Sequence, residues 1–426
     1  MIAPDRTKAP AIKTFGRLHL PPQTVETLPG GVTLHVSADD GCPLTRLCIV
    51  GSGGKDEASS PALAMVAAAL ATEGSRSCDE DATADILDFC GATISGRCTD
   101  HFTRVEITSL APAMLQLLPV VGALIAEPQF SRGRLEAVKS SLASRCAYEA
   151  SRVDDIAYKA AFRMIAGEGN PQLRFPMPED FASPESPQVY KRLNEVFRAE
   201  RVHVFISGAV DAALLDAVRS IVATFPAGVA LKSNIVPYSP AAPAEIHIPH
   251  SGAEQCAVEV MIPAISRSHP DYIPLRLAVT ALGGFFGSRL MQNIREDKGL
   301  TYGISASLNG VQEGSFVDIS AQCAPEYTRQ LIDELRIELA AMRTRLLSKD
   351  ELLRMRLFEQ TRLASLLDNA IATGDHYLTA HTIGLPPHYF EEQEKITAEI
   401  TPEEIAEVSA RYLRPEEMRT VIVGEK

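Results

Sequence analysis

The sequence predicts an α+β protein made of two tandem, homologous halves, each an α/β sandwich in which helices back a sheet. An internal repeat is the main reason: the order helix, helix, glycine, strand, strand occurs in residues 59–98 and again in residues 268–322. Gly91 of the first copy aligns with Gly299 of the second, an offset of 208 residues (299 − 91) in a chain of 426. Helices and strands come in blocks and not in strict alternation, which favours α+β layers.

The first copy starts with a helix that the tripeptide Ser59-Ser60-Pro61 marks at its beginning. This alanine-rich segment continues to Gly74, and a second helix with acidic residues at its start ends at Gly91. Residues 92–110 then alternate polar and apolar side chains, which is typical of two strands joined by a turn.

The second copy repeats this order. Its first helix begins around residues 268–271 and runs to the pair Gly283-Gly284. A second helix, with Ser288 as its possible cap, ends at Gly299. Two strands follow, and we expect the turn between them at Asn309-Gly310.

The junction between the halves is expected in residues 225–245, which are rich in proline and poor in pattern. We therefore assign residues 1–230 to an N-terminal domain and residues 240–426 to a C-terminal domain. Each half also contains long helical segments, at residues 134–166 and from residue 326 onward. The Pro-rich residues 171–188 are expected to form an ordered surface loop.

Composition excludes several classes of partner. The chain has 41 Lys and Arg against 54 Asp and Glu, a net charge of −13, which argues against nucleic acid and anionic membranes as partners. Apolar runs stay below the ~18 residues that a membrane span needs, and the N-terminus lacks the apolar stretch of a signal peptide. The eight cysteines form no C-x-x-C pair, and we expect reduced, structural thiols, Cys90 and Cys98 included. These features predict a cytoplasmic protein.

The histidines do not predict a metal site. The chain has no H-x-x-E-H or H-x-x-x-H pair among its ten histidines. His247 and His250 are three residues apart on an expected strand, so their rings point to opposite faces. His376 and His381 are five residues apart, which misses the i,i+4 spacing that lets one helix face bind zinc. Ordinary surface or core histidines are the simpler interpretation of both pairs.

Residues 282–303 are the most informative stretch, with a Gly-rich loop, a short helix and a strand that we expect to start near Leu300. Arg295 lies in the last turn of that helix, and Tyr302 is expected on the strand after it. The tight turn at Gly299 would bring the guanidinium and the phenol to one edge of the sheet. There the two donors could hold a peptide carbonyl or its oxyanion. The alternative is structural: an Arg that balances a helix dipole and a half-buried Tyr.

The pattern G-G-x-x-x-S-R-L, followed by R-x-x-x-G-L-x-Y, closely resembles the second half of peptidase family M16, the zinc peptidases related to pitrilysin and mitochondrial processing peptidase. Residues 28–36, LPGGVTLHV, resemble the opening strand of that family, and the resemblance covers nearly the whole chain. It implies a clam-like, LuxS/MPP-like metallohydrolase fold with the zinc site on the first half. It also implies a substrate-binding pair, here Arg295 and Tyr302, on the second. The Gly-rich loop of this motif contains Gly283, Gly284, Gly287 and Ser288.

The zinc-binding residues of the family are missing. Active members carry H-x-x-E-H on the first helix, and the resemblance places Met65, Ala68 and Ala69 at the two ligand positions and the base position between them. The third ligand of the family, a Glu, falls near Arg145. Methyl groups neither bind zinc nor accept a proton from water. We expect no metal at the family position and no cofactor on this chain.

The resemblance therefore implies a non-catalytic, substrate-positioning subunit of a heteromeric zinc metallopeptidase that acts on peptides or unfolded segments. Such a chain has no independent peptidase activity, and its partner, an H-x-x-E-H-containing sibling, supplies the zinc. A homodimer is the other assembly that the sequence leaves open. The alternative functions are a catalytically inactive structural scaffold and a peptide-binding module without a catalytic partner.

Overall fold

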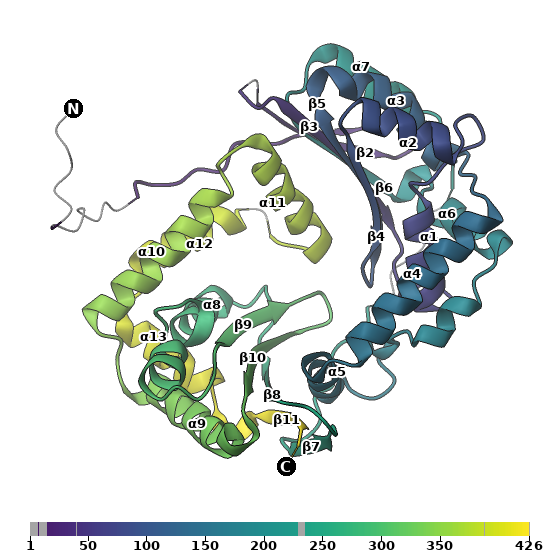
Figure 1. Ribbon diagram of the computed structural model, residues 1–426. Helices are drawn as coiled ribbons and strands as arrows, with labels where there is room; N and C mark the ends of the chain where they lie inside the picture. The colour runs from purple at the N-terminus through teal and green to yellow at the C-terminus, as the bar shows by residue number, and fades with distance from the viewer. Residues whose placement is uncertain (1–6, 8–14, 40, 229–234, 387, 426) are drawn as a thin grey trace.

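The computed structural model contains two sheets that face each other, each backed by helices on its outer side (Figure 1). The predicted α+β class with two sheet-and-helix halves is confirmed. The structure describes residues 7, 15–39, 41–228, 235–386 and 388–425. Part of the expected junction, residues 229–234, lies outside the described residues. So does most of the N-terminal segment in which a signal peptide was not expected.

The first sheet has the strand order β1-β2-β6-β3-β5-β4, in which β2 and β6 are parallel and the other neighbours antiparallel. Its strands are β1 (Thr24–Thr27), β2 (Thr33–Ala38), β3 (Leu44–Ser52), β4 (Thr93–Cys98), β5 (Phe102–Leu110) and β6 (Val202–Gly208). The helices of this half are α1 (Pro61–Leu70), α2 (Glu80–Phe89), α3 (Ala111–Ala126), α4 (Arg132–Ala150), α5 (Val153–Ala166), α6 (Ser186–Val196) and α7 (Ala212–Val222).

The second sheet repeats this arrangement with the order β7-β11-β8-β10-β9, so that β9 forms one edge as β4 does in the first. Its strands are β7 (Glu245–Pro249), β8 (Cys256–Ala264), β9 (Ile304–Gly310), β10 (Ser315–Cys323) and β11 (Arg419–Gly424). Its helices are α8 (Tyr272–Val279), α9 (Thr328–Thr344), α10 (Lys349–Ser365), α11 (Ala370–Ile383), α12 (Tyr389–Glu399) and α13 (Pro402–Tyr412). Two π-helical segments, η4 (Thr280–Gly284) and η5 (Met291–Asp297), follow α8.

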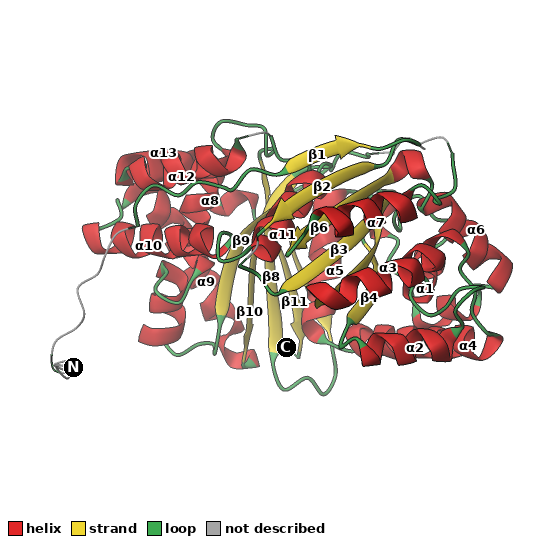
Figure 2. Cartoon of the chain, turned by 90° about the horizontal axis from the view of Figure 1, so that it is seen from above, coloured by secondary structure: helices red, strands yellow, loops and turns green. Residues whose placement is uncertain are grey.

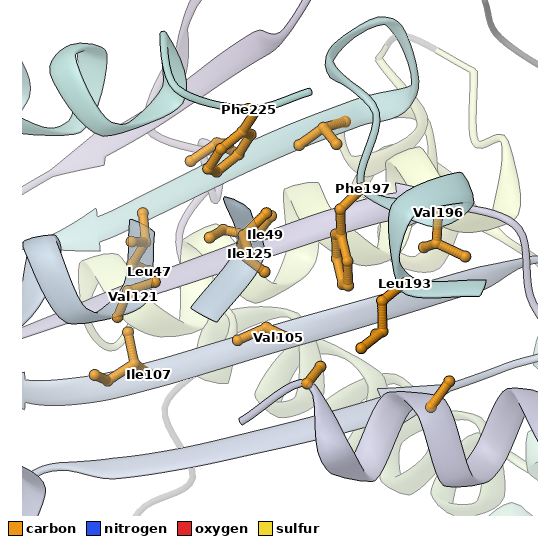
Figure 3. Packing of buried hydrophobic residues seen from close by; sticks show 14 of the residues in the cluster. Leu47, Ile49, Val105, Ile107, Val121, Ile125, Leu193, Val196, Phe197 and Phe225 are labelled. Atoms are coloured by element: carbon orange, nitrogen blue, oxygen red, sulfur yellow. The ribbon is translucent and has the colours of Figure 1, made fainter. Parts of the chain in front are cut away.

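Each half has its own apolar core between the sheet and the outer helices. In the first half, side chains of β3 and β5 such as Ile49 and Val105 face Val121 and Ile125 of α3 (Figure 3). The alternation predicted for these strands explains this packing, because every second side chain of a strand points to the same face. The inner face of each sheet, opposite to this core, does not contact these outer helices and packs against another element.

That partner is a helix from the other half. α5, which follows α4 of the first half, packs on β8 and β11 of the second sheet. α11 of the second half packs on β2 and β6 of the first sheet, with Leu378 against Phe205. Figure 2 shows α5 and α11 in the middle of the molecule, among the strands. The exchange of helices buries apolar surface between the halves and fixes the two sheets relative to each other.

Polar contacts strengthen the contact between α11 and the first sheet. Asp375 accepts two hydrogen bonds from the guanidinium of Arg46, at 2.5 and 2.6 Å. Gly374 lies so close to the sheet that a Cβ there would meet the side chain of Ser207. The sequence did not reveal this exchange, since the partners of each helix belong to the other half of the chain.

Most predicted elements of the repeat are present, with two differences in the second copy. The turn between β9 and β10 lies at residues 311–314 and not at Asn309-Gly310, which are the last residues of β9. Ser288 does not act as a side-chain cap: its hydroxyl is buried and has no hydrogen-bond partner among the described atoms. The segment 171–188 is ordered as predicted and contains two short 3₁₀ helices.

The eight cysteines are all free, although Cys90 and Cys98 are only half-buried. Among the helices that the structure describes, none has the length and apolar character to cross a bilayer.

Candidate functional site

The positions that hold zinc in the family lie on α1 and are closed by packing. Ala68 is buried, and Met65 and Ala69 are half-buried on the same helix. α1 lies against β4 so closely that a Cβ added at Gly96 would overlap the carbonyl oxygen of Ala68. The contact between this helix and its strand is therefore made by backbone and small side chains, which offer a metal ion no ligands.

The position of the third ligand of the family falls on an exposed part of α4. Arg145 is exposed and lies 3.8 Å from Glu149 one helical turn later, in a solvent-facing ion pair. The next residue, Cys146, is buried and donates to the carbonyl oxygen of Pro176. An arginine paired at the surface adds no ligand to the site, and its positive charge would oppose a cation nearby.

The corresponding region of the second half is open. The Gly-rich loop follows directly from the π-helical turns of η4, where a Cβ at Gly283 would collide with Ala306 of β9. Glycine at this position lets the loop approach the edge strand. Gly284 packs in the same manner against Thr280 of its own helical segment, and Gly287 lies against the ring of Phe285. These glycines and Ser288 position the loop, and no further role is evident from their contacts.

Arg295 lies in the last turn of η5, as predicted from the sequence. Its guanidinium stacks over the ring of Phe286 at 5.0 Å from the ring centre and lies 3.5 Å from the carboxylate of Glu296. The stacking holds the charge beside the aromatic ring while its donors stay accessible to other groups.

Tyr302 lies in the short segment before β9 and not on the strand, because β9 starts at Ile304. Its side chain is 86% exposed, so the alternative prediction of a half-buried structural tyrosine is wrong. The segment itself is held firmly by Thr301, whose hydroxyl donates to the carbonyl oxygen of Gln322 at 2.6 Å. Gly303 in turn donates its backbone N–H to the same hydroxyl at 3.1 Å. An exposed phenol thus stands on an anchored backbone.

Tyr302 and Phe286 line one cavity of about 590 Å³ on the inner face of the second sheet. Its wall combines the Gly-rich loop, the start of β9, and residues of β8 and β10, and Asp154 of α5 adds a residue from the first half. Arg295 reaches this cavity only through Phe286, on which it stacks. The structure therefore places Arg295 and Tyr302 near the same open cavity. No direct contact between their side chains is seen among the described residues.

A buried carboxyl at the wall of the cavity was missed by the sequence analysis. Glu259 of β8 is 4% exposed, lines the cavity and lies beside the carboxyl of Asp318 on β10. Burial, followed by the neighbouring carboxyl of Asp318, raises the pKa of Glu259 far above its usual range. Alternation along both strands was a usable signal, because Glu259 and Asp318 fall on positions that face inward.

The histidines considered as candidates do not converge as a zinc site in the described part of the chain. His376 and His381 share α11, but His381 packs against His35 and His203 of the first sheet, with ring centres 5.8 and 3.9 Å away. His35 Nε2 lies 3.2 Å from His203 Nδ1. Burial lowers the pKa of all three rings of this histidine cluster, to about 4 for His35 and about 3 for His203. The cluster is thus a neutral contact between the halves.

Comparison with known proteins identifies relatives of both the sequence and the fold. Residues 186–357 match the family model described as the peptidase M16 inactive domain. An uncharacterized zinc protease of Streptomyces coelicolor is 29% identical over 99 residues, which cover 23% of this chain and 22% of that relative. The chain thus matches about a fifth of the length of this curated relative.

Solved structures share the fold over nearly the whole chain. A peptidase M16 inactive domain from Pseudomonas fluorescens superposes with a TM-score of 0.85 at 20% identity, over 95% of this chain and 98% of the other. A protease from Helicobacter pylori gives 0.84 at 12% identity, over 95% and 100%. The periplasmic protease PqqL from Escherichia coli gives 0.79 at 15% identity, over 97% of this chain but 47% of its own. The family model over residues 186–357 and the shared fold thus support a non-catalytic relative of the M16 peptidases, and the chain contains no H-x-x-E-H.

Proposed function

We propose that this chain is the non-catalytic, substrate-positioning subunit of a heteromeric M16 zinc metallopeptidase that cleaves peptides or unfolded segments. The observation that carries the proposal is the exposed phenol of Tyr302 at the mouth of a cavity of about 590 Å³. A tyrosine without a structural role in its own chain is a suitable donor to a group that a substrate brings. Its hydroxyl would donate a hydrogen bond to the carbonyl oxygen that becomes an oxyanion during peptide cleavage.

The edge strand beside the cavity supports binding of an extended peptide. Among the strands that the structure describes, β9 pairs with β10 alone and so forms an edge of the second sheet. A peptide that runs along its free edge would form backbone hydrogen bonds of the β-augmentation type, with alternate side chains facing the cavity. Arg295, held over Phe286, would contribute a cation for a peptide carbonyl or carboxylate.

The first half supports the non-catalytic part of the proposal. Ala68 is buried against β4 at the position of the family's general base, and Met65 and Ala69 offer no ligand atoms for zinc. Hydrolysis of a peptide would therefore need zinc and a base from elsewhere. We infer that the partner is an M16 sibling that carries H-x-x-E-H, and that zinc is bound there.

The alternative is a structural subunit. One similar structure is a chain in complex III2 from Candida albicans, with a TM-score of 0.73 at 14% identity. A purely structural role would leave Tyr302 without a function, whereas its exposure on an anchored segment favours a role in binding. The other alternative is a peptide-binding module without a catalytic partner. Such a module would bind peptides at this surface but would not stimulate their cleavage.

The experiment is co-purification of this chain with an H-x-x-E-H sibling, followed by a peptide-cleavage assay on each chain alone and on the mixture. We expect no cleavage by this chain alone, little by the sibling, and a large increase when both are mixed. Tyr302→Phe in this chain should remove most of that increase, and Tyr148→Phe is its matched control, because Tyr148 is also strongly exposed but lies on α4, outside the lining of the cavity. Full activity of the sibling alone, unchanged by this chain, would contradict the proposal.

A further inference from the structure

Three side chains that can bind metals meet where the β9–β10 turn touches the first half. Asp56 follows β3, His101 lies in the turn between β4 and β5, and Glu313 lies in the turn between β9 and β10. One ligand atom from each lies within 4.8 Å of those of the other two. The three residues are far apart in the sequence, so no motif reveals the cluster.

Glu313 is the central member, and it is nearly inaccessible. Its side chain is 2% exposed, and its Oε1 lies 2.5 Å from His101 Nε2. Neither of its carboxylate oxygens has a hydrogen bond of regular geometry to the atoms that the structure describes. On the other side of the imidazole, Asp56 Oδ2 lies 3.8 Å from His101 Nδ1. A carboxylate buried to this extent needs a strong cationic partner.

The protein side chains around the cluster do not supply enough positive charge. With His101 protonated, two carboxylates would face one cation and leave a net charge of −1. Lys55 is engaged by Asp100 at 2.7 Å, and Arg174 donates to the backbone carbonyl of Asp56. The cluster is therefore short of positive charge.

We propose that Asp56, His101 and Glu313 bind one divalent cation of the Zn²⁺ type, which fastens the β9–β10 turn of the second half to the first half. A dication with a neutral imidazole and two carboxylates gives a cluster without net charge. The nitrogen ligand selects against Ca²⁺ and Mg²⁺, which prefer oxygen ligands alone. Zn²⁺ binds imidazole and carboxylate at about 2.1 Å, which separates ligand atoms by roughly 3.4 Å in a tetrahedral site.

One ligand atom from each of the three residues lies within 4.8 Å of the other two, so side-chain rotations that turn a single ring nitrogen of His101 toward both carboxylates complete the site. Water would occupy the fourth position. The site is distinct from the zinc position of the family on α1, which has no ligand side chains in this chain. The proposal therefore differs from the expectation that this chain binds no metal. It is independent of the peptidase role proposed above, because its consequence is a fixed contact between the halves.

The test uses the full chain, freed of metal with a chelator and titrated calorimetrically with Zn²⁺ alone. We expect one Zn²⁺ per chain and a higher melting temperature when the ion is bound. Glu313→Gln keeps the shape of the side chain and removes its charge, and it should weaken Zn²⁺ binding at least about tenfold. His247→Ala removes a histidine outside the cluster and should leave binding unchanged.

A second variant, Asp56→Asn, guards against a folding defect in Glu313→Gln, and circular dichroism without metal verifies that each variant is folded. Loss of affinity in folded Glu313→Gln and Asp56→Asn, with none in His247→Ala, supports the site. The proposal is overturned if the parent takes up no Zn²⁺, in which case His101 is a protonated ion-pair partner only. Equal binding by the parent and the folded variants overturns it as well.

Discussion

The two halves contain the same unit of helix, glycine and edge strand, yet they expose different parts of it. Gly91 and Gly299 both adopt left-handed backbone, with φ of +57° and +63°, and both end a helix. In the first half β4 begins at Thr93, two residues after its glycine, whereas β9 begins at Ile304, five residues after its own. The three additional residues form the segment that places Tyr302 outside the sheet.

Packing around the edge strand differs between the halves as well. In the first half, Gly96 brings β4 into backbone contact with Ala68, on the helix where active relatives bind zinc. In the second half, the helix changes into π-helical turns and a glycine loop, and a cavity remains beside the strand. Under the proposed function, loss of the zinc ligands in one half and retention of the substrate-side residues in the other are separate events in a duplicated fold. Each half can be tested by itself.

Rebuilding the family motif in the first half should have the largest effect on stability. Met65→His, Ala68→Glu and Ala69→His together introduce a carboxylate at a position that is 1% exposed. An unpaired buried carboxylate costs on the order of 4 kcal/mol, and the third ligand is still missing near Arg145. We expect a much less stable protein with weak zinc binding at best and no robust peptidase activity.

Denaturant unfolding and zinc titration measure both effects. The variants should be made in a Glu313→Gln background, so that only zinc at the rebuilt site is counted. A stable triple variant with robust cleavage would show that the first half is not closed and that the third ligand has been misplaced.

A pair of single glycine substitutions sharpens the comparison between the halves. Gly96→Ala would force its new Cβ into the carbonyl oxygen of Ala68, whereas a Cβ at Gly303 would have no neighbour within 4 Å. We expect a loss of about 3 kcal/mol in the free energy of unfolding for Gly96→Ala and a change within about 0.5 kcal/mol for Gly303→Ala. Similar losses for both variants would contradict the assignment of a closed and an open half.

Arg295 should affect substrate binding more than folding. Arg295→Ala removes a guanidinium that lies 37% exposed over Phe286, and we expect the KM of the assembled peptidase to rise about tenfold, or ~1.4 kcal/mol. Arg343→Ala, on α9 and paired with Glu416, is the matched control. If both variants had the parent's KM, Arg295 would be a structural residue of its helix.

The histidine cluster between α11 and the first sheet should make the contact between the halves sensitive to acid. Burial lowers the pKa of His203 to about 3 and that of His35 to about 4 in the folded state. Because these values lie below the unfolded value of about 6.5, the stabilisation is complete above pH 6.5 and is lost as the pH falls.

His203→Asn removes one of these groups. The free energy of unfolding of this variant, relative to the parent, should therefore improve as the pH is lowered from about 7 to 5. His19→Asn, at an exposed position, is the control and should follow the parent. A constant difference between His203→Asn and the parent over this range would show that the cluster does not titrate as described.

The sequence was sufficient for the repeat, the α+β class and the missing zinc ligands, because these depend on local patterns and on a motif. It placed Arg295 correctly in the last turn of a helix that Gly299 ends. It placed Tyr302 on a strand, because the alternation of residues 300–308 does not reveal that Thr301 ties the preceding segment to Gln322.

Contacts between the halves could not be predicted from local sequence patterns. The swap of α5 and α11, the ion pair of Arg46 with Asp375 and the cluster around His101 all join residues far apart in the chain. Glu259 and Asp318 could be predicted in part: alternation places both on the inner face, but their approach to each other depends on the register of β8 and β10. Only the assembled sheets show which inward-facing residues meet.

The central claim is that Tyr302 completes the active site of a partner. Tyr302→Phe keeps the ring and removes the hydroxyl, so the most direct measurement is the kcat of peptide cleavage by the assembled complex with this variant. The account predicts a decrease on the order of 10²-fold, or ~2.7 kcal/mol, because an oxyanion donor is lost. The melting temperature and partner binding should match those of the parent. Unimpaired turnover by a complex that contains Tyr302→Phe would contradict the account.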